Sequence, residues 1–235
     1  MSSVSFRSLA PVAAVALICG FGGAALWTWS GLGHSQTKAY LLDNPGILPD
    51  MVASYEKEEA GKRLAQVAGD VTEPFPGAVL GNPEGTVTLV EFTDYGCGYC
   101  RKSADHVAKL ISSNPDLRVV VREWPIFEGS DHAAKMALAA AKQGKFRAFH
   151  DAMFAQGNPT RANISAAANT AKIDMDQARR FIEAPDAGFE LSKNMAFAQQ
   201  LGFSGTPSWI IGGAVLEGAV GQAALQDAID AARAL

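Results

Sequence analysis

Cysteine is scarce in this sequence, and its scarcity excludes two kinds of structure. Only three cysteines occur among 235 residues, at Cys19, Cys97 and Cys100. A small domain held together by several disulfides needs more cysteines, spread further apart. A closed zinc site needs four ligands, and neither a second cysteine pair nor histidines at ligand-like spacing accompany Cys97 and Cys100. We therefore predict no bound metal and no cofactor.

A strong excess of charge is also missing. Charged residues make up 19% of the chain and the net charge is −4 at neutral pH. Nucleic acids attract strongly basic proteins, so we predict no nucleic-acid partner. The composition is that of a globular chain that can fill a core, and the length allows one domain of roughly 150 to 200 residues plus an appendage.

Charge is absent altogether from Leu9 to Trp29, a stretch of 21 positions that follows Arg7. Such a stretch is long enough to cross a bilayer, and it also fits a signal peptide with a long apolar region. Because no clear cleavage site follows, we favour an uncleaved membrane anchor in residues 1–30. The weak charge bias, Arg7 before and Lys38 after, places the N-terminus in the cytoplasm and the body of the chain outside. Cys19 then lies within the anchor as an apolar residue.

Residues 31–75 are predicted to form a short helical N-terminal region. A break at Asn44-Pro45-Gly46 separates two helices. The second helix carries one apolar stripe, formed by Leu48, Met51, Val52 and Tyr55. Two interpretations stay open: the stripe packs on the main domain, or it joins copies of the chain into a homo-oligomer.

The main domain, residues 76–235, is predicted to alternate strands and helices. Strand Val87–Thr93, a helix from Cys97 to about Ile111 and strand Leu117–Trp124 predict a β–α–β unit with a parallel strand pair. A long helical stretch follows from Asp131 to Leu201. The last predicted elements are two short strands and a helix, Ser208–Ile211, Ala214–Leu216 and Gly221–Arg233.

Cys97 and Cys100 stand between a strand and the start of a helix, a position that favours a reactive thiolate. First-turn amide hydrogens and the helix dipole stabilise negative charge there. The first cysteine can therefore attack disulfides near neutral pH. The second, one turn further along, can attack the resulting mixed disulfide and release the product.

A second element is Gly205-Thr206-Pro207, just before a predicted strand. A proline that enters a strand from a glycine-containing loop is a candidate for a cis peptide bond. On its own this signal is weak, because most bonds to proline are trans.

Together, Cys97-Gly-Tyr-Cys100 and Thr206-Pro207 resemble the thioredoxin superfamily, which places a C-x-x-C helix opposite a cis-proline loop. Pro207 follows Cys100 by 107 positions, a spacing that resembles the DsbA-type branch, whose thioredoxin fold contains an inserted helical domain. The resemblance covers roughly Pro76 to Leu235. It implies an α/β fold with a helical insertion at about 130–201, preceded here by the membrane-spanning helix and the short helical hairpin.

The resemblance also implies roles for three further residues. Thr206 and Pro207 correspond to the positions that shape the substrate groove and keep metals off the cysteines. Glu91, six residues before Cys97, matches a buried acid of DsbA-like proteins that is thought to move protons at the cysteines. An acid in the middle of an apolar strand needs a task or a partner, although a glutamate at a strand edge facing solvent is the alternative.

Two further features indicate which members of the DsbA-type branch the chain resembles most. Gly-Tyr between the cysteines is the dipeptide typical of DsbC-like isomerases, as is Thr before the proline, whereas Pro-His is usual in the DsbA type. The segment Tyr40–Leu48 resembles the N-terminal region of ScsC-like proteins, which are associated with copper tolerance and some of which oligomerise through this region.

From these features we predict an extracytoplasmic protein-disulfide oxidoreductase that introduces or exchanges disulfides through Cys97 and Cys100. Its partners would be reduced or misbridged secreted proteins and a membrane redox protein, and its location the periplasmic side of a bacterial inner membrane, held by the N-terminal helix. Two alternatives stay open, a disulfide isomerase that acts as an oligomer and a copper-binding thiol protein.

Overall fold

The computed structural model describes residues 6–29 and 32–234, which form two compact units, Met1–Tyr55 and Glu56–Leu235. In the first unit the helices are α1 (Phe6–Trp29), α2 (Leu32–Asp43), the 3-10 turn η1 (Pro45–Ile47) and the start of α3 (Leu48–Thr72). The break predicted at Asn44-Pro45-Gly46 is present as this turn. The side chains of the stripe on α3 are exposed: Leu48, Met51, Val52 and Tyr55.

The predicted membrane-spanning helix is not supported. Leu9 to Trp29 lies in helix α1, yet within residues 6–29 and 32–234 no helix has both the length and the apolar character needed to cross a bilayer.

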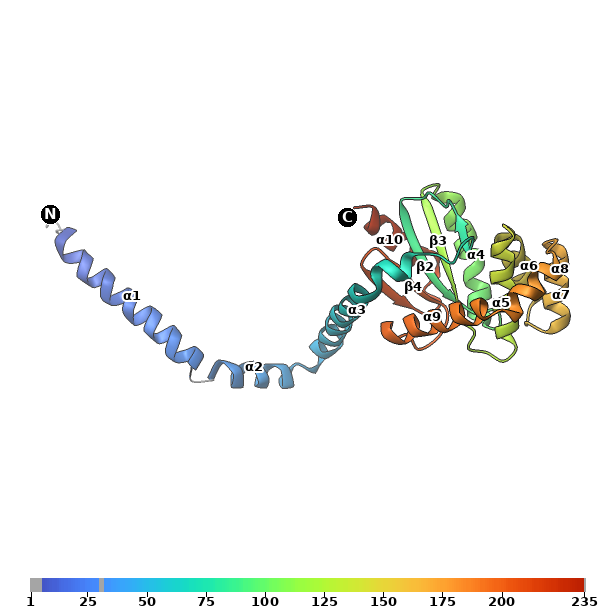
Figure 1. Ribbon diagram of the computed structural model, residues 1–235. Coiled ribbons are helices and arrows are strands. Elements are labelled where there is room, and N and C mark those ends of the chain that lie inside the picture. Colours follow the sequence, from blue (N-terminus) through green and yellow to red (C-terminus); the bar gives the residue numbers. More distant parts are fainter. Residues whose placement is uncertain (1–5, 30–31, 235) are drawn as a thin grey trace. The chain divides into compact units, whose positions relative to one another are not determined.

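The second unit is built on one five-stranded sheet with the strand order β1-β3-β2-β4-β5. Its strands are β1 (Val79–Gly81), β2 (Val87–Thr93), β3 (Leu117–Glu123), β4 (Ser208–Ile211) and β5 (Ala214–Glu217). β2 and β3 are parallel, and the other neighbouring pairs are antiparallel. The central strands are rich in β-branched residues and buried on both faces, which fits the position between two helical layers (Figure 1).

Helices cover both faces of this sheet. The helices that follow β2 are α4 (Gly98–Ser113), α5 (Ser130–Lys142), α6 (Phe146–Gln156), α7 (Arg161–Thr170), α8 (Met175–Glu183), α9 (Pro185–Leu201) and α10 (Gly221–Arg233). The core on one face joins α4 and α10 to the sheet and continues into α5 to α8. The core on the other face brings together the second half of α3 and α9. This is a thioredoxin-like α/β fold with α5 to α9 inserted between β3 and β4.

The second half of α3 was not predicted to belong to this core. Leu64, Val67 and Val71 are buried against the sheet. Arg122 on β3 fixes the end of the helix, because its guanidinium donates to the backbone carbonyls of Asp70, Val71 and Glu73. Charged residues from Glu56 to Arg63 conceal this pattern in the sequence, since the apolar stripe resumes only after them.

Candidate active site

Cys97 and Cys100 lie at the junction of β2 and α4. Cys97 is the N-cap of α4, with φ −83° and ψ 118°, and its Sγ accepts the backbone N–H of Cys100 at 3.4 Å. An N-cap that accepts a helix amide and faces the positive end of the dipole is a favourable place for a thiolate. The two thiols are free in this structure.

The two thiols differ in their surroundings. Cys97 keeps 3% of its surface exposed, whereas Cys100 is completely buried. Burial raises the pKa of Cys100 well above its usual value and outweighs the opposing effect of the nearby Thr206 and Thr93 hydroxyls. Cys97 is thus the less buried cysteine of the pair, and burial favours the protonated form of Cys100.

The loop before β4 lies against Cys97. The Thr206–Pro207 peptide bond is cis, as the sequence suggested. The thiol of Cys97 donates to the backbone carbonyl of Thr206 at 3.3 Å. β4 pairs with β2 in the sheet, and this pairing brings two segments together that are far apart in the chain.

Glu91 is buried in the middle of β2, not exposed at a strand edge. It keeps 1% of its surface accessible, and neither carboxyl oxygen has a hydrogen-bond partner among the described residues. Burial raises the pKa of Glu91 to about 8. Glu91 is therefore protonated at neutral pH, and its side chain alternates onto the same face of the sheet as Thr93.

Asp94 organises the turn before Cys97, and the sequence analysis missed it. Its buried carboxylate accepts the backbone N–H of Gly96 at 2.6 Å, of Ile126 at 2.6 Å and of Phe127 at 2.9 Å. These bonds tie the turn to the loop after β3. A side chain at Gly96 would meet the Cβ of Phe127 at 2.9 Å, so the two segments approach closely.

Apolar side chains are exposed around this turn. Tyr99 lies between the two cysteines, while Ile126 and Phe127 lie in the loop held by Asp94. Between 44% and 63% of each of these three side chains is exposed. Such a surface beside Cys97 suits contact with an incompletely folded chain.

A second missed group lies deeper in the core. Tyr95 donates its hydroxyl hydrogen to Oε1 of Glu123 at 2.9 Å and lies 3.1 Å from Nδ1 of His150. All three side chains are buried. Glu123 is an acid in an apolar strand, so the argument that singled out Glu91 could have found it; Tyr95 and His150 carry no comparable signal.

Comparison with protein-family profiles identifies the family of the chain. The profile of the DSBA-like thioredoxin domain matches residues 88–230, a segment that contains both cysteines and the cis-proline loop. The chain belongs to the DSBA-like thioredoxin domain family. The family match and the two cysteines support thiol–disulfide oxidoreductase chemistry.

Solved structures of related proteins have a similar fold. A thioredoxin-like oxidoreductase from Silicibacter pomeroyi is 46% identical, with a TM-score of 0.64 over 67% of this chain and 92% of that one. A variant of ScsC from Proteus mirabilis is 25% identical, with a TM-score of 0.70 over 86% and 95%. The thiol–disulfide exchange protein α-DsbA2 from Wolbachia pipientis is 26% identical, with a TM-score of 0.67 over 74% and 96%.

Curated relatives with a detectable sequence match are much longer proteins. The Na⁺/H⁺ antiporter NhaA 1 of Salinispora arenicola is 29% identical over 164 residues, which are 68% of this chain and 25% of that protein. The chain thus spans about a quarter of the length of this relative.

Proposed function

We propose that the chain exchanges disulfides with secreted proteins through Cys97 and Cys100, outside the cytoplasm. The observation that carries the proposal is the position of Cys97. Its sulfur caps α4, is the more accessible of the pair and lies 3.3 Å from the carbonyl of Thr206. An extended client segment that pairs with the backbone of Thr206 as an added strand brings its own sulfur to Cys97.

The reaction can be followed sulfur by sulfur. A client thiolate attacks Cys97 of the enzyme disulfide, a client–Cys97 bond forms, and Cys100 leaves with the electron pair and takes up a proton. A second client thiolate attacks the client sulfur, so that the client disulfide forms and Cys97 leaves as a thiolate. The helix amide on Cys97 stabilises this leaving thiolate, and Pro207 shapes the groove beside it.

An oxidising compartment is required for the net formation of client disulfides. We therefore place the chain in the periplasm, with reduced or misbridged secreted proteins as clients. A membrane-bound electron-transfer protein then takes up the two electrons and two protons from Cys97 and Cys100 and restores the disulfide.

Isomerisation is the second candidate, and one observation favours it. The exposed stripe of α3 is an apolar surface that a second copy of the chain can cover. An isomerase acts with reduced Cys97 and gains from several active sites around one misfolded client. Light scattering on the purified chain tests this: we expect a mass of more than one chain, and a single-chain mass would contradict the oligomeric isomerase.

Trapping of the mixed disulfide tests the proposed chemistry. Cys100→Ser removes the resolving sulfur, so we expect a covalent client adduct that accumulates and disappears on reduction. Cys97→Ser should form no adduct, and Cys19→Ser, the matched control, should behave like the unaltered chain. Mass spectrometry without reductant measures all three. Full function of Cys100→Ser in cells would contradict disulfide exchange and favour thiolate binding of copper.

A further inference from the structure

Cys100 needs a partner for its proton, because solvent does not reach it. The thiol is completely buried, yet it must gain a proton when the enzyme disulfide opens and lose one when the disulfide closes. This holds for oxidation and isomerisation alike. The groups that act on Cys100 are Cys97, the hydroxyls of Thr93 and Thr206 and the backbone of Asp94. Cys97 is the reacting sulfur, and the other three groups are not acids that can supply the proton.

Glu123 lies directly beside Thr93. The two residues are register partners on the parallel strands β2 and β3, and alternation places both on the face of the sheet that α4 covers. Oγ1 of Thr93 and Oε2 of Glu123 are buried and have no hydrogen-bond partner among the described residues. Two unsatisfied polar atoms at paired positions are costly unless they serve each other or a shared proton.

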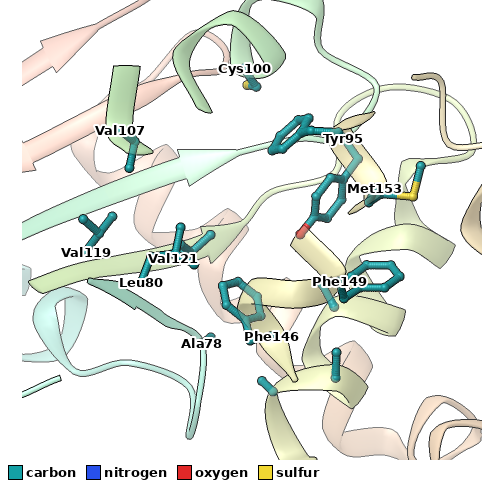
Figure 2. Packing of buried hydrophobic residues seen from close by; sticks show 14 of the residues in the cluster. Ala78, Leu80, Tyr95, Cys100, Val107, Val119, Val121, Phe146, Phe149 and Met153 are labelled. Carbon is teal, nitrogen blue, oxygen red and sulfur yellow. The ribbon is translucent and has the colours of Figure 1, made fainter. Parts of the chain in front are cut away.

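The other carboxyl oxygen of Glu123 begins a series of hydrogen bonds that leads toward the surface. Oε1 is bonded to the Tyr95 hydroxyl, which also bonds to His150. Figure 2 shows the Tyr95 hydroxyl pointing away from Cys100, toward the helix that carries Phe149. His150 lines a small pocket between α4 and α6, together with the charged residues Arg147 and Asp151.

This triad can hold its proton in two arrangements. A hydroxyl both donates and accepts, and a neutral imidazole donates or accepts at Nδ1 according to its tautomer. With Glu123 ionised, His150 donates to Tyr95 and Tyr95 donates to Glu123. With the proton on Oε2 of Glu123, the oxygen paired with Thr93 in the proposed transfer, Oε1 still accepts from Tyr95; with the proton on Oε1, both bonds reverse. Burial lowers the pKa of His150 to about 4, so the imidazole is neutral at pH 7 and both tautomers are accessible.

The surroundings favour the protonated form of Glu123. Burial and the neighbouring acids Asp94 and Glu91 raise its pKa well above the usual value and outweigh the Tyr95 hydrogen bond. Asp151 adds a further negative charge near Tyr95. Arg122, the preceding residue on β3, takes part in the core of the opposite face, where it binds Glu190 at 2.9 Å.

We propose that Glu123 is a proton-exchanging acid for Cys100, which it reaches through Thr93, and that Tyr95 and His150 connect it to solvent. The inference rests on the proposed function. When the Cys97–Cys100 bond breaks, the Cys100 sulfur keeps the electron pair, Thr93 passes it a hydroxyl proton and Glu123 replaces that proton. The carboxylate is then reprotonated along Tyr95 and His150. When the disulfide closes, each transfer runs in reverse.

A two-step reaction of the reduced full-length chain with glutathione disulfide separates Cys97 from Cys100. In the first step the Cys97 thiolate attacks, so that a Cys97–glutathione adduct forms and one glutathione leaves. In the second step Cys100 loses its proton and attacks Cys97, which releases the second glutathione. Rapid mixing, acid quench and mass spectrometry between pH 5.5 and 9 measure both rates in Glu123→Gln, Tyr95→Phe and the control Glu190→Gln.

We expect Glu123→Gln to slow the second step at pH 7 by at least about tenfold and to leave the first step within about twofold. The deficit should shrink as the pH rises, because solvent base then removes the thiol proton. Tyr95→Phe keeps the acid and breaks the route to His150, so it should slow the second step to the same extent. This variant provides the test if Glu123→Gln does not fold. Glu190→Gln, a buried acid on the opposite face, should keep both rates.

Three results would overturn the inference. A second step at the unaltered rate and pH profile in both Glu123→Gln and Tyr95→Phe removes Glu123 from proton transfer. An equal slowing of both steps, or a slowing in Glu190→Gln as well, reduces Glu123 to a structural role. An unaltered chain that forms the Cys97 adduct but never closes to the Cys97–Cys100 disulfide contradicts the proposed function itself.

Discussion

At the scale of single residues, Glu91 couples the active site to the stability of the fold. Its pKa is about 8 in the folded chain because of burial, against about 4.3 in an unfolded chain. Between these values the folded state binds more protons than the unfolded state, so this group lowers stability as the pH rises from about 4 to 8. Above pH 8 the loss is complete, since Glu91 is then ionised in both states.

Glu91→Gln should remove this dependence. The difference in free energy of unfolding between Glu91→Gln and the unaltered chain should grow in favour of the variant by about 3 kcal/mol from pH 4 to pH 7. Guanidinium unfolding at several pH values measures it. A difference that stays constant with pH would show that Glu91 keeps the same charge in both states.

The sequence predicted some residues of the site and missed others for a physical reason. Cys97 and Cys100 carry a local signal, since position at a helix start decides their chemistry. Glu123 and Asp94 act through contacts between segments that are remote in sequence: Tyr95 meets His150 of α6, and Asp94 meets the loop after β3. Contacts of this kind leave no periodicity in either segment.

At the scale of elements, the strands and helices that the sequence predicts from long apolar runs are present in the structure. β2, β4 and α10 have the predicted bounds, because continuous apolar runs and clear end signals define them. β1 was missed, since its three residues form a strand only by antiparallel pairing with β3. The second half of α3 was missed because tertiary packing, not local pattern, buries it.

The end of α3 depends on Arg122. This side chain is completely buried and binds three backbone carbonyls at that helix end as well as Glu190 and Asn194. We expect Arg122→Ala to lower the free energy of unfolding by about 3 to 5 kcal/mol, because it leaves the Glu190 carboxylate and the carbonyls unpaired. Chemical denaturation measures the change.

Amide hydrogen exchange shows where the loss of the Arg122 contacts weakens the structure. In a variant that still folds, Arg122→Lys, amide exchange should rise first in the last turns of α3. The control is Arg179→Ala, since the ion pair of Arg179 with Asp176 is exposed and worth no more than about 1 kcal/mol. Equal exchange of α3 in Arg122→Lys and in the unaltered chain would contradict this account.

At the scale of the whole molecule, the chain combines a DSBA-like thioredoxin unit with a separate helical N-terminal unit. The inserted helical domain was expected from the resemblance to the DsbA-type branch, which the long gap between the two motifs supports. The sequence could not predict where the units divide, because helix α3 runs through Tyr55 and Glu56 without a break. A change of packing partner along one continuous helix leaves no loop signal.

The central claim is that Cys97 and Cys100 form one reversible redox pair, and a redox titration of the full chain in glutathione buffers tests it most directly. The account predicts a reversible two-electron couple near or above roughly −200 mV, in the range of oxidases and isomerases. A couple near about −270 mV would instead indicate a reductase. Absence of any reversible couple would contradict the account.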